Sequence, residues 1–227
     1  MDALAPHRGF AMCALVAATV ALAACGGSSS NDSTTASGGA PGASEVSAEP
    51  VSSAGDNPFT APAGKDMKGV EPPPGAVGMG GPASYRGGLP GLYGGTRDYA
   101  TCDAEKLVFF LERNPDKAAA WAGTLGIPVT RIRRYVFHLT PVLLRTDTRV
   151  TNHGYVNGRA TPLQSILQAG TAVFVNDYGE PVVKCYCGNP LTPPMLYRSP
   201  VYVGPRWHVF GSNHITIINR SITIIDT

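Results

Sequence analysis

Carboxylate, guanidinium, amide and imidazole groups gather in one short stretch of this 227-residue chain. The residues are Asp147, Arg149, Asn152, His153, Tyr155 and Arg159. Such a cluster near two turns can bind a carbohydrate or a peptide, with Tyr155 as a stacking surface, or it can be a buried polar network that fixes loop geometry. We favour the buried network and keep the six residues as candidate ligand-binding positions.

Catalytic arrangements can also be drawn from this region. A hydrolase triad would use Ser165, His153 and Asp147, but Ser165 lies between Gln and Ile and lacks the Gly-x-Ser-x-Gly turn of a nucleophile elbow. A thiol enzyme would use a cysteine with His153, His208 or His214 as the base. No sequence signature supports either arrangement, so no catalytic residue is assigned.

The N-terminal segment indicates where the protein is located. An apolar run from residue 9 to residue 24 follows a basic head and ends in Leu-Ala-Ala-Cys-Gly. The run is too short to span a bilayer comfortably but suits a signal-peptide core. It resembles the bacterial lipoprotein signal, which implies a signal peptide at residues 1–24 and a lipidated Cys25. The alternatives are an ordinary secretory signal and an uncleaved anchor.

Three cysteines remain after the signal and the lipidated residue, namely Cys102, Cys185 and Cys187. One disulfide is expected outside the cytoplasm. Because a bridge between Cys185 and Cys187 would close a small, strained ring, Cys102 should pair with one of them. The remaining thiol should be a small buried side chain. The Cys-x-Cys spacing is not that of a zinc site, so we predict no metal and no cofactor.

Glycine and proline divide the chain into a tether and a domain. Residues 26–95 contain 17 Gly and 9 Pro, which is unfavourable for a packed core. We therefore predict a disordered tether at residues 25–95 and a single folded domain at residues 96–227. About 130 residues are enough for one hydrophobic core.

Charge changes at the same boundary. The tether has 3 basic and 6 acidic residues, whereas the domain has 14 basic and 9 acidic residues. The modest positive charge of the domain could favour anionic lipid headgroups or cell-wall polymers, but we favour an ordinary solvated helix face as its explanation. Nucleic acid is excluded as a partner, because no binding motif is present and the protein is expected outside the membrane.

Hydrophobic periodicity and turn residues predict the elements that position these side chains. Helices are expected at residues 101–111, 114–126, 128–139 and 161–170; strands are expected at 142–144, 148–151, 171–175 and 181–187, with a two-residue hairpin joining 214–218 to 221–225. The Asn157-Gly158 dipeptide predicts a tight turn. The pattern indicates an α+β domain in which N-terminal short helices pack on a largely antiparallel sheet.

Four sequence runs within the domain resemble an uncharacterised extracytoplasmic domain family of actinobacteria. The runs are Thr-Arg-Val-Thr-Asn-His-Gly at 148–154, Gly-Arg-Ala-Thr-Pro-Leu-Gln-Ser at 158–165 with Leu-Gln-Ala-Gly-Thr-Ala-Val at 167–173, and Cys-x-Cys-Gly-Asn-Pro-Leu at 185–191. That family occurs in lipoproteins and as the outer part of membrane proteins. The resemblance implies an extracytoplasmic location but no activity.

These observations lead to one functional expectation and one alternative. We expect a non-catalytic binding or sensory domain, anchored by lipid to the outer face of the cytoplasmic membrane, with a cell-wall polymer or an envelope protein as its partner. The alternative is a cell-envelope hydrolase or thiol enzyme that uses His153 or the pair Cys185 and Cys187.

Overall fold

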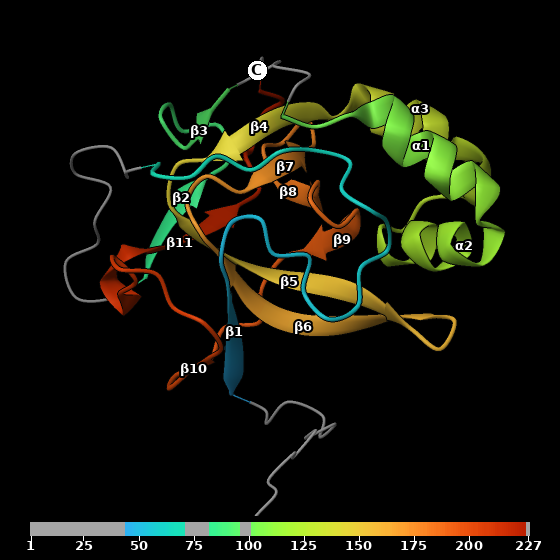
Figure 1. The fold of residues 1–227 in the computed structure, drawn as a ribbon. Coiled ribbons are helices and arrows are strands. Elements are labelled where there is room, and N and C mark those ends of the chain that lie inside the picture. The colour runs from blue at the N-terminus through green and yellow to red at the C-terminus, as the bar shows by residue number, and fades with distance from the viewer. Residues whose placement is uncertain (1–43, 71–81, 96–100, 226–227) are drawn as a thin grey trace, which may run out of the picture. The chain divides into compact units, whose positions relative to one another are not determined.

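The computed structural model describes residues 44–70, 82–95 and 101–225 (Figure 1). Its helices are α1 (Ala104–Arg113), α2 (Pro115–Thr124) and α3 (Ile132–His138), with 3₁₀ turns η1 (Val129–Arg131) and η2 (Ser212–His214). Its strands are β1 (Glu45–Glu49), β2 (Ala83–Arg86), β3 (Tyr93–Gly94), β4 (Thr140–Leu144), β5 (Asp147–Val156), β6 (Arg159–Leu167), β7 (Ala172–Val175), β8 (Pro181–Lys184), β9 (Asn189–Thr192), β10 (Val201–Val203) and β11 (Ile215–Asn219). The predicted signal peptide at 1–24 and Cys25 lie outside these residues.

The strands form one mixed sheet of eleven strands within the described residues. Its main path runs β10-β1-β6-β5-β9-β8-β7-β4-β3, and β11 joins it by pairing with both β5 and β2. Pairings along the path from β6 to β3 are antiparallel, whereas those of β1 and β11 are parallel. The predicted α+β class is therefore confirmed, in a strand-rich form.

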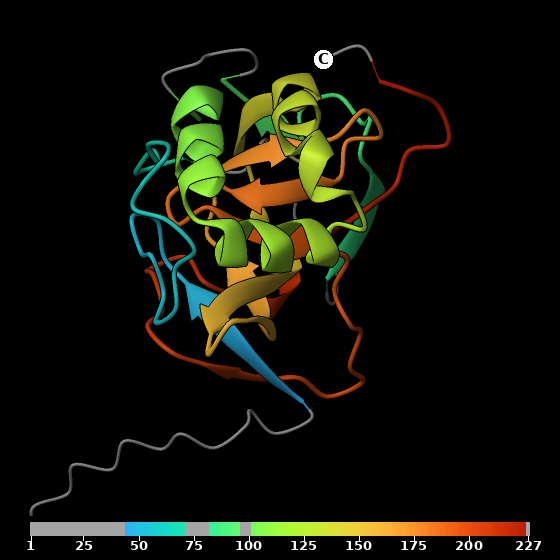
Figure 2. The ribbon, with the colours of Figure 1, turned by 90° about the vertical axis from the view of Figure 1, so that its right-hand side faces the viewer.

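The three predicted N-terminal helices are confirmed, and they lie together on one side of the sheet (Figure 2). Asp103 caps α1 by accepting a hydrogen bond from the backbone N–H of Lys106, and Pro115 occupies the first turn of α2. The apolar side of each helix packs into one core with Phe59 and Phe174, and Trp121 is its largest fully buried side chain.

The helix predicted at residues 161–170 is wrong, because this segment forms most of β6. The Asn157-Gly158 turn is confirmed, with φ of 49° and 81°, and it closes a two-residue hairpin in which Val156 pairs with Arg159. β6 then pairs with β5 over nine positions and with β1 on its other edge. Pairing on both edges outweighs the weak helical pattern of the segment.

The C-terminal hairpin predicted at 214–218 and 221–225 is also wrong. Residues Ile215–Asn219 form β11, but this strand pairs in parallel with β2 on one edge and β5 on the other. No edge of β11 is left for residues 221–225. Ile222 and Ile224 consequently remain exposed, at 77% and 69%.

The predicted boundary at residue 96 is wrong, because part of the expected tether belongs to the folded domain. β1 lies in the sheet between β10 and β6, and Phe59 is fully buried in the helix-covered core. The described residues 44–70, 82–95 and 101–225 all belong to one compact unit. A five-residue segment forms a strand once partner edges are available on both sides, and glycine and proline content alone does not reveal those edges.

Among the described residues, no helix has the length and apolar character needed to cross a bilayer.

Candidate functional site

The six polar residues predicted as a ligand site are spread along β5 and the hairpin that follows it. Asp147 is buried and accepts hydrogen bonds from the backbone N–H of Ala169 and the indole N–H of Trp207, each at 2.9 Å. Arg149 is also buried, donates to the carbonyl of Met195 and stacks over Tyr197. These two side chains are occupied by the protein itself.

The remaining members of the predicted cluster point to different neighbours. Asn152 donates to the Glu49 carboxylate, and His153 Nδ1 lies 3.2 Å from the carbonyl oxygen of Pro190. Burial lowers the pKa of His153 below its ordinary value. Tyr155 packs against the Phe59 ring and beneath the Lys117 ammonium, whereas Arg159 is exposed at the hairpin end. The six residues do not converge on one cleft.

The hydrolase triad drawn from the sequence is not assembled. Asp147 and His153 are six residues apart on one extended strand, a separation of roughly 20 Å. Ser165 is fully buried on β6, and its hydroxyl donates to the carbonyl of Leu163.

Arg149 does border one cavity. A pocket of about 190 Å³ lies beside it, with Tyr135 and Glu180 on its other walls. Arg149 Nε is buried without a hydrogen-bond partner. This volume is below that of an ordinary ligand pocket, so the cavity is a weak candidate for a ligand-binding site.

Of the three cysteines in the described part of the chain, two are joined in a disulfide and one is a buried thiol. Cys102 and Cys185 form a disulfide, which resolves the choice that the sequence left open. Cys187 is buried and free, as expected, and burial raises its pKa to about 12, although Lys184 acts in the opposite direction. At neutral pH this thiol is protonated and enclosed, and is therefore a poor nucleophile. No cluster of metal-ligating side chains occurs among the described residues.

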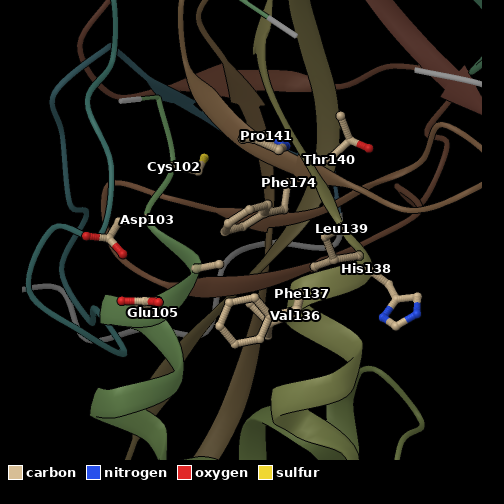
Figure 3. A pocket seen from close by; sticks show the side chains of 11 residues that line it. Cys102, Asp103, Glu105, Val136, Phe137, His138, Leu139, Thr140, Pro141 and Phe174 are labelled. Atoms are coloured by element: carbon tan, nitrogen blue, oxygen red, sulfur yellow. The ribbon is translucent and has the colours of Figure 1, made fainter. Parts of the chain in front are cut away.

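A pocket of about 600 Å³ opens where the start of α1 meets the end of α3 (Figure 3). Its walls include the buried apolar residues Val136, Leu139, Pro141 and Phe174. The disulfide sets one side, because Cys102 lines the pocket and is bonded to Cys185 just beyond the end of β8. This volume lies in the range of small-molecule and side-chain binding pockets.

The mouth of the pocket is acidic. The exposed residues Asp103 and Glu105 lie on the α1 side, and His138 and the exposed Phe137 lie on the α3 side (Figure 3). The last carbonyls of α3 end here and add partial negative charge, while the N-terminus of α1, which Asp103 caps, adds partial positive charge. An apolar interior with an acidic mouth suits a ligand that has an apolar body and a positively charged group.

No local sequence pattern predicted this pocket. Asp103 and Glu105 fall within the predicted first helix, and Phe174 falls within the strand predicted at 171–175. The pocket arises because α1, α3, β4 and β7 meet, and they are separated by up to about 70 residues in the chain. Phe137, an aromatic residue near the end of the third helix, is a local feature that could have indicated this surface, but its exposure is known only from the fold.

The sequence matches the family described as "Domain of unknown function (DUF6777)" over residues 83–227. Comparisons with curated proteins and with solved structures found no match.

Proposed function

The chain belongs to the DUF6777 family, and from this premise we propose that it is a lipid-anchored binding domain on the outer face of an actinobacterial cytoplasmic membrane. Its ligand occupies the pocket between α1 and α3 and has an apolar body with a cationic group. A basic amino-acid side chain of an envelope protein or an amino group of a cell-wall polymer has this chemistry.

The observation that carries the binding proposal is the contrast between two regions. The polar side chains of β5 are held by internal hydrogen bonds, whereas the α1–α3 pocket is open, apolar inside and acidic at its mouth. The location rests on the N-terminal signal, which resembles that of bacterial lipoproteins and ends at Cys25.

A simple aromatic amine tests the pocket. Phenethylammonium should shift the NMR signals of Glu105, Phe137 and Leu139, and the neutral phenethyl alcohol should bind more weakly. The substitution Glu105→Gln should weaken phenethylammonium binding about threefold at low salt, because one exposed charge contributes modestly to binding.

The matched control for this test is Asp116→Asn. It removes the same charge from the first turn of α2, where the side chain does not border the pocket. Equal weakening by both substitutions, or shifts confined to other surfaces, would reject the pocket as the binding site.

The anchor is tested separately on the full chain in a bacterial host. A clickable fatty-acid analogue should label the protein, and Cys25→Ser should abolish the label and release the protein from the membrane fraction. Cys187→Ala should retain both the label and the membrane location. Labelling that persists in Cys25→Ser would contradict the anchor.

A further inference from the structure

Three side chains from different strands meet in the interior of the domain. The ammonium of Lys184 lies 2.6 Å from Oε2 of Glu49, and the amide nitrogen of Asn152 lies 2.9 and 3.0 Å from the two oxygens of the same carboxylate. Their exposures are 0% for Lys184, 5% for Glu49 and 4% for Asn152. A charged pair buried this completely is uncommon in proteins.

The strand register directs the lysine and the asparagine to the same side of the sheet. Lys184 on β8 pairs with Asn189 of β9, and Asn152 on β5 pairs with Leu191 of β9. Because positions 189 and 191 are two residues apart on one strand, their cross-strand partners share a face. Both side-chain nitrogens bond to the same Oε2 atom, so they are at most two hydrogen-bond lengths apart.

One atom of this group has no hydrogen-bond partner. The carbonyl oxygen of Asn152, Oδ1, is buried and unpaired. A buried oxygen without a donor costs free energy and calls for an explanation. Rotating the amide by 180° exchanges its oxygen and nitrogen, and places Oδ1 where a protonated Glu49 donates to it. The arrangement then has a lysine amine and an acid-activated amide carbonyl side by side.

We propose that Lys184 and Asn152 join through an intramolecular isopeptide bond, with Glu49 as the catalytic residue that transfers the protons. The structure shows the three groups before the reaction, as an ion pair and an intact amide.

The reaction needs only the atoms of these side chains. Lys184 transfers a proton to Glu49, and the neutral amine attacks Cγ of Asn152 while Glu49 donates a hydrogen bond to Oδ1. The bond between Cγ and Nδ2 breaks, the departing nitrogen takes one proton from Glu49 and leaves as ammonia, and Glu49 takes one proton back from the attacking amine. One C–N bond forms and one breaks, with no change in oxidation state and no cofactor.

The ion pair between Lys184 and Glu49 is arranged for the first proton transfer. Burial is the largest single effect and disfavours the ammonium of Lys184, but attraction to Glu49, the hydrogen bond to it and the nearby Asp66 and Cys187 together outweigh burial, so the pKa of Lys184 is raised above its ordinary value. The resting state is therefore an ion pair, with the base already in contact with the proton to be moved. Proton transfer replaces two buried charges by two neutral groups, and a low-dielectric interior lowers the cost of that exchange relative to water.

The test is peptide mapping of the full purified chain after reduction and trypsin digestion. Trypsin should fail to cut after Lys184, and peptide 150–159 should be joined to peptide 160–198 in a product with two N-termini. The mass of this product should be the sum of the two peptides less one ammonia. Recovery of free peptide 150–159, with complete cleavage after Lys184, would overturn the proposal.

Two substitutions test the roles of Glu49 and Lys184 in forming the isopeptide bond. Glu49→Gln keeps the shape but cannot carry the proton, and Lys184→Arg keeps the positive charge but removes the amine nucleophile, so both should eliminate the joined product. Lys117→Arg is the control, since Lys117 is half-buried and its ammonium bonds to the carbonyls of Pro58 and Phe59 rather than to Glu49, and it should leave the product unchanged. A joined product that persists in Lys184→Arg would also refute the assignment, whatever the stability of the variants.

Discussion

A chain that begins at residue 96 should not fold, whereas one that begins at residue 40 should unfold in a single cooperative transition. Removing the residues before 96 deletes β1 from between β6 and β10 and leaves the β6 edge unpaired. It also removes Phe59 from the core and Glu49 from the buried Lys184.

The expected loss exceeds what a domain of this size can tolerate. Removing a buried phenylalanine side chain costs about 3–5 kcal/mol, and removing one partner of a buried ion pair costs about 3–5 kcal/mol. The total stability of a typical domain is about 5–15 kcal/mol. The truncation further breaks backbone hydrogen bonds from Ala63 to Cys185 and from Asp103 to Ala63.

Circular dichroism and thermal unfolding of the purified fragments provide the measurement. A third fragment that begins at residue 83, where the match to the family begins, is an informative comparison because it keeps β2 and β3 but lacks β1. It should be unfolded as well. A cooperative transition for either short fragment would show that residues 44–70 are dispensable for folding.

Replacing both disulfide cysteines, Cys102→Ala with Cys185→Ala, should lower the free energy of unfolding of fragment 40–227 by about 4 kcal/mol. The bond links positions 83 residues apart, so its loss greatly increases the conformational freedom of the unfolded chain. Loss of the disulfide also releases the start of α1 from Cys185. The wall of the α1–α3 pocket that Cys102 forms should then be less firmly held in place.

Urea denaturation monitored by tryptophan fluorescence measures this change, with Cys187→Ala as the control. Cys187 is buried but unbonded, so its replacement should cost about 1 kcal/mol. Thiol titration of the unmodified fragment should find one reactive thiol after denaturation and none before. Equal stability of the double variant and the control would show that the disulfide contributes little to folding.

Features that depend on adjacent residues were predictable. The cap at Asp103, the first-turn proline of α2 and the Asn157-Gly158 turn each arise from the conformational preferences of a few neighbouring residues. The disulfide was narrowed to two choices by ring strain, and the distinction between Cys185 and Cys187 needed the path of β8.

Strands with distant partners were not predictable in the same way. β6 has a weak helical pattern, and its extended form is stabilised by β5 and β1 on its two edges. Residues 221–225 have the sequence pattern of a strand, but they cannot pair with β11, because both edges of β11 are already paired, one with β2 and the other with β5. Which edges are open depends on the whole sheet and not on the segment.

The amino-acid sequence by itself determined the three N-terminal helices, the tight turn and the participation of Cys102 in a disulfide, because these depend on local sterics, capping and ring strain. The tertiary structure alone decided that residues 44–70 belong to the domain, that the α1–α3 pocket exists, and that Glu49, Asn152 and Lys184 meet. These three residues are up to 135 positions apart, and their contact is produced by strand order and register. A pairing of that kind is a property of the folded sheet and has no local signature in the chain.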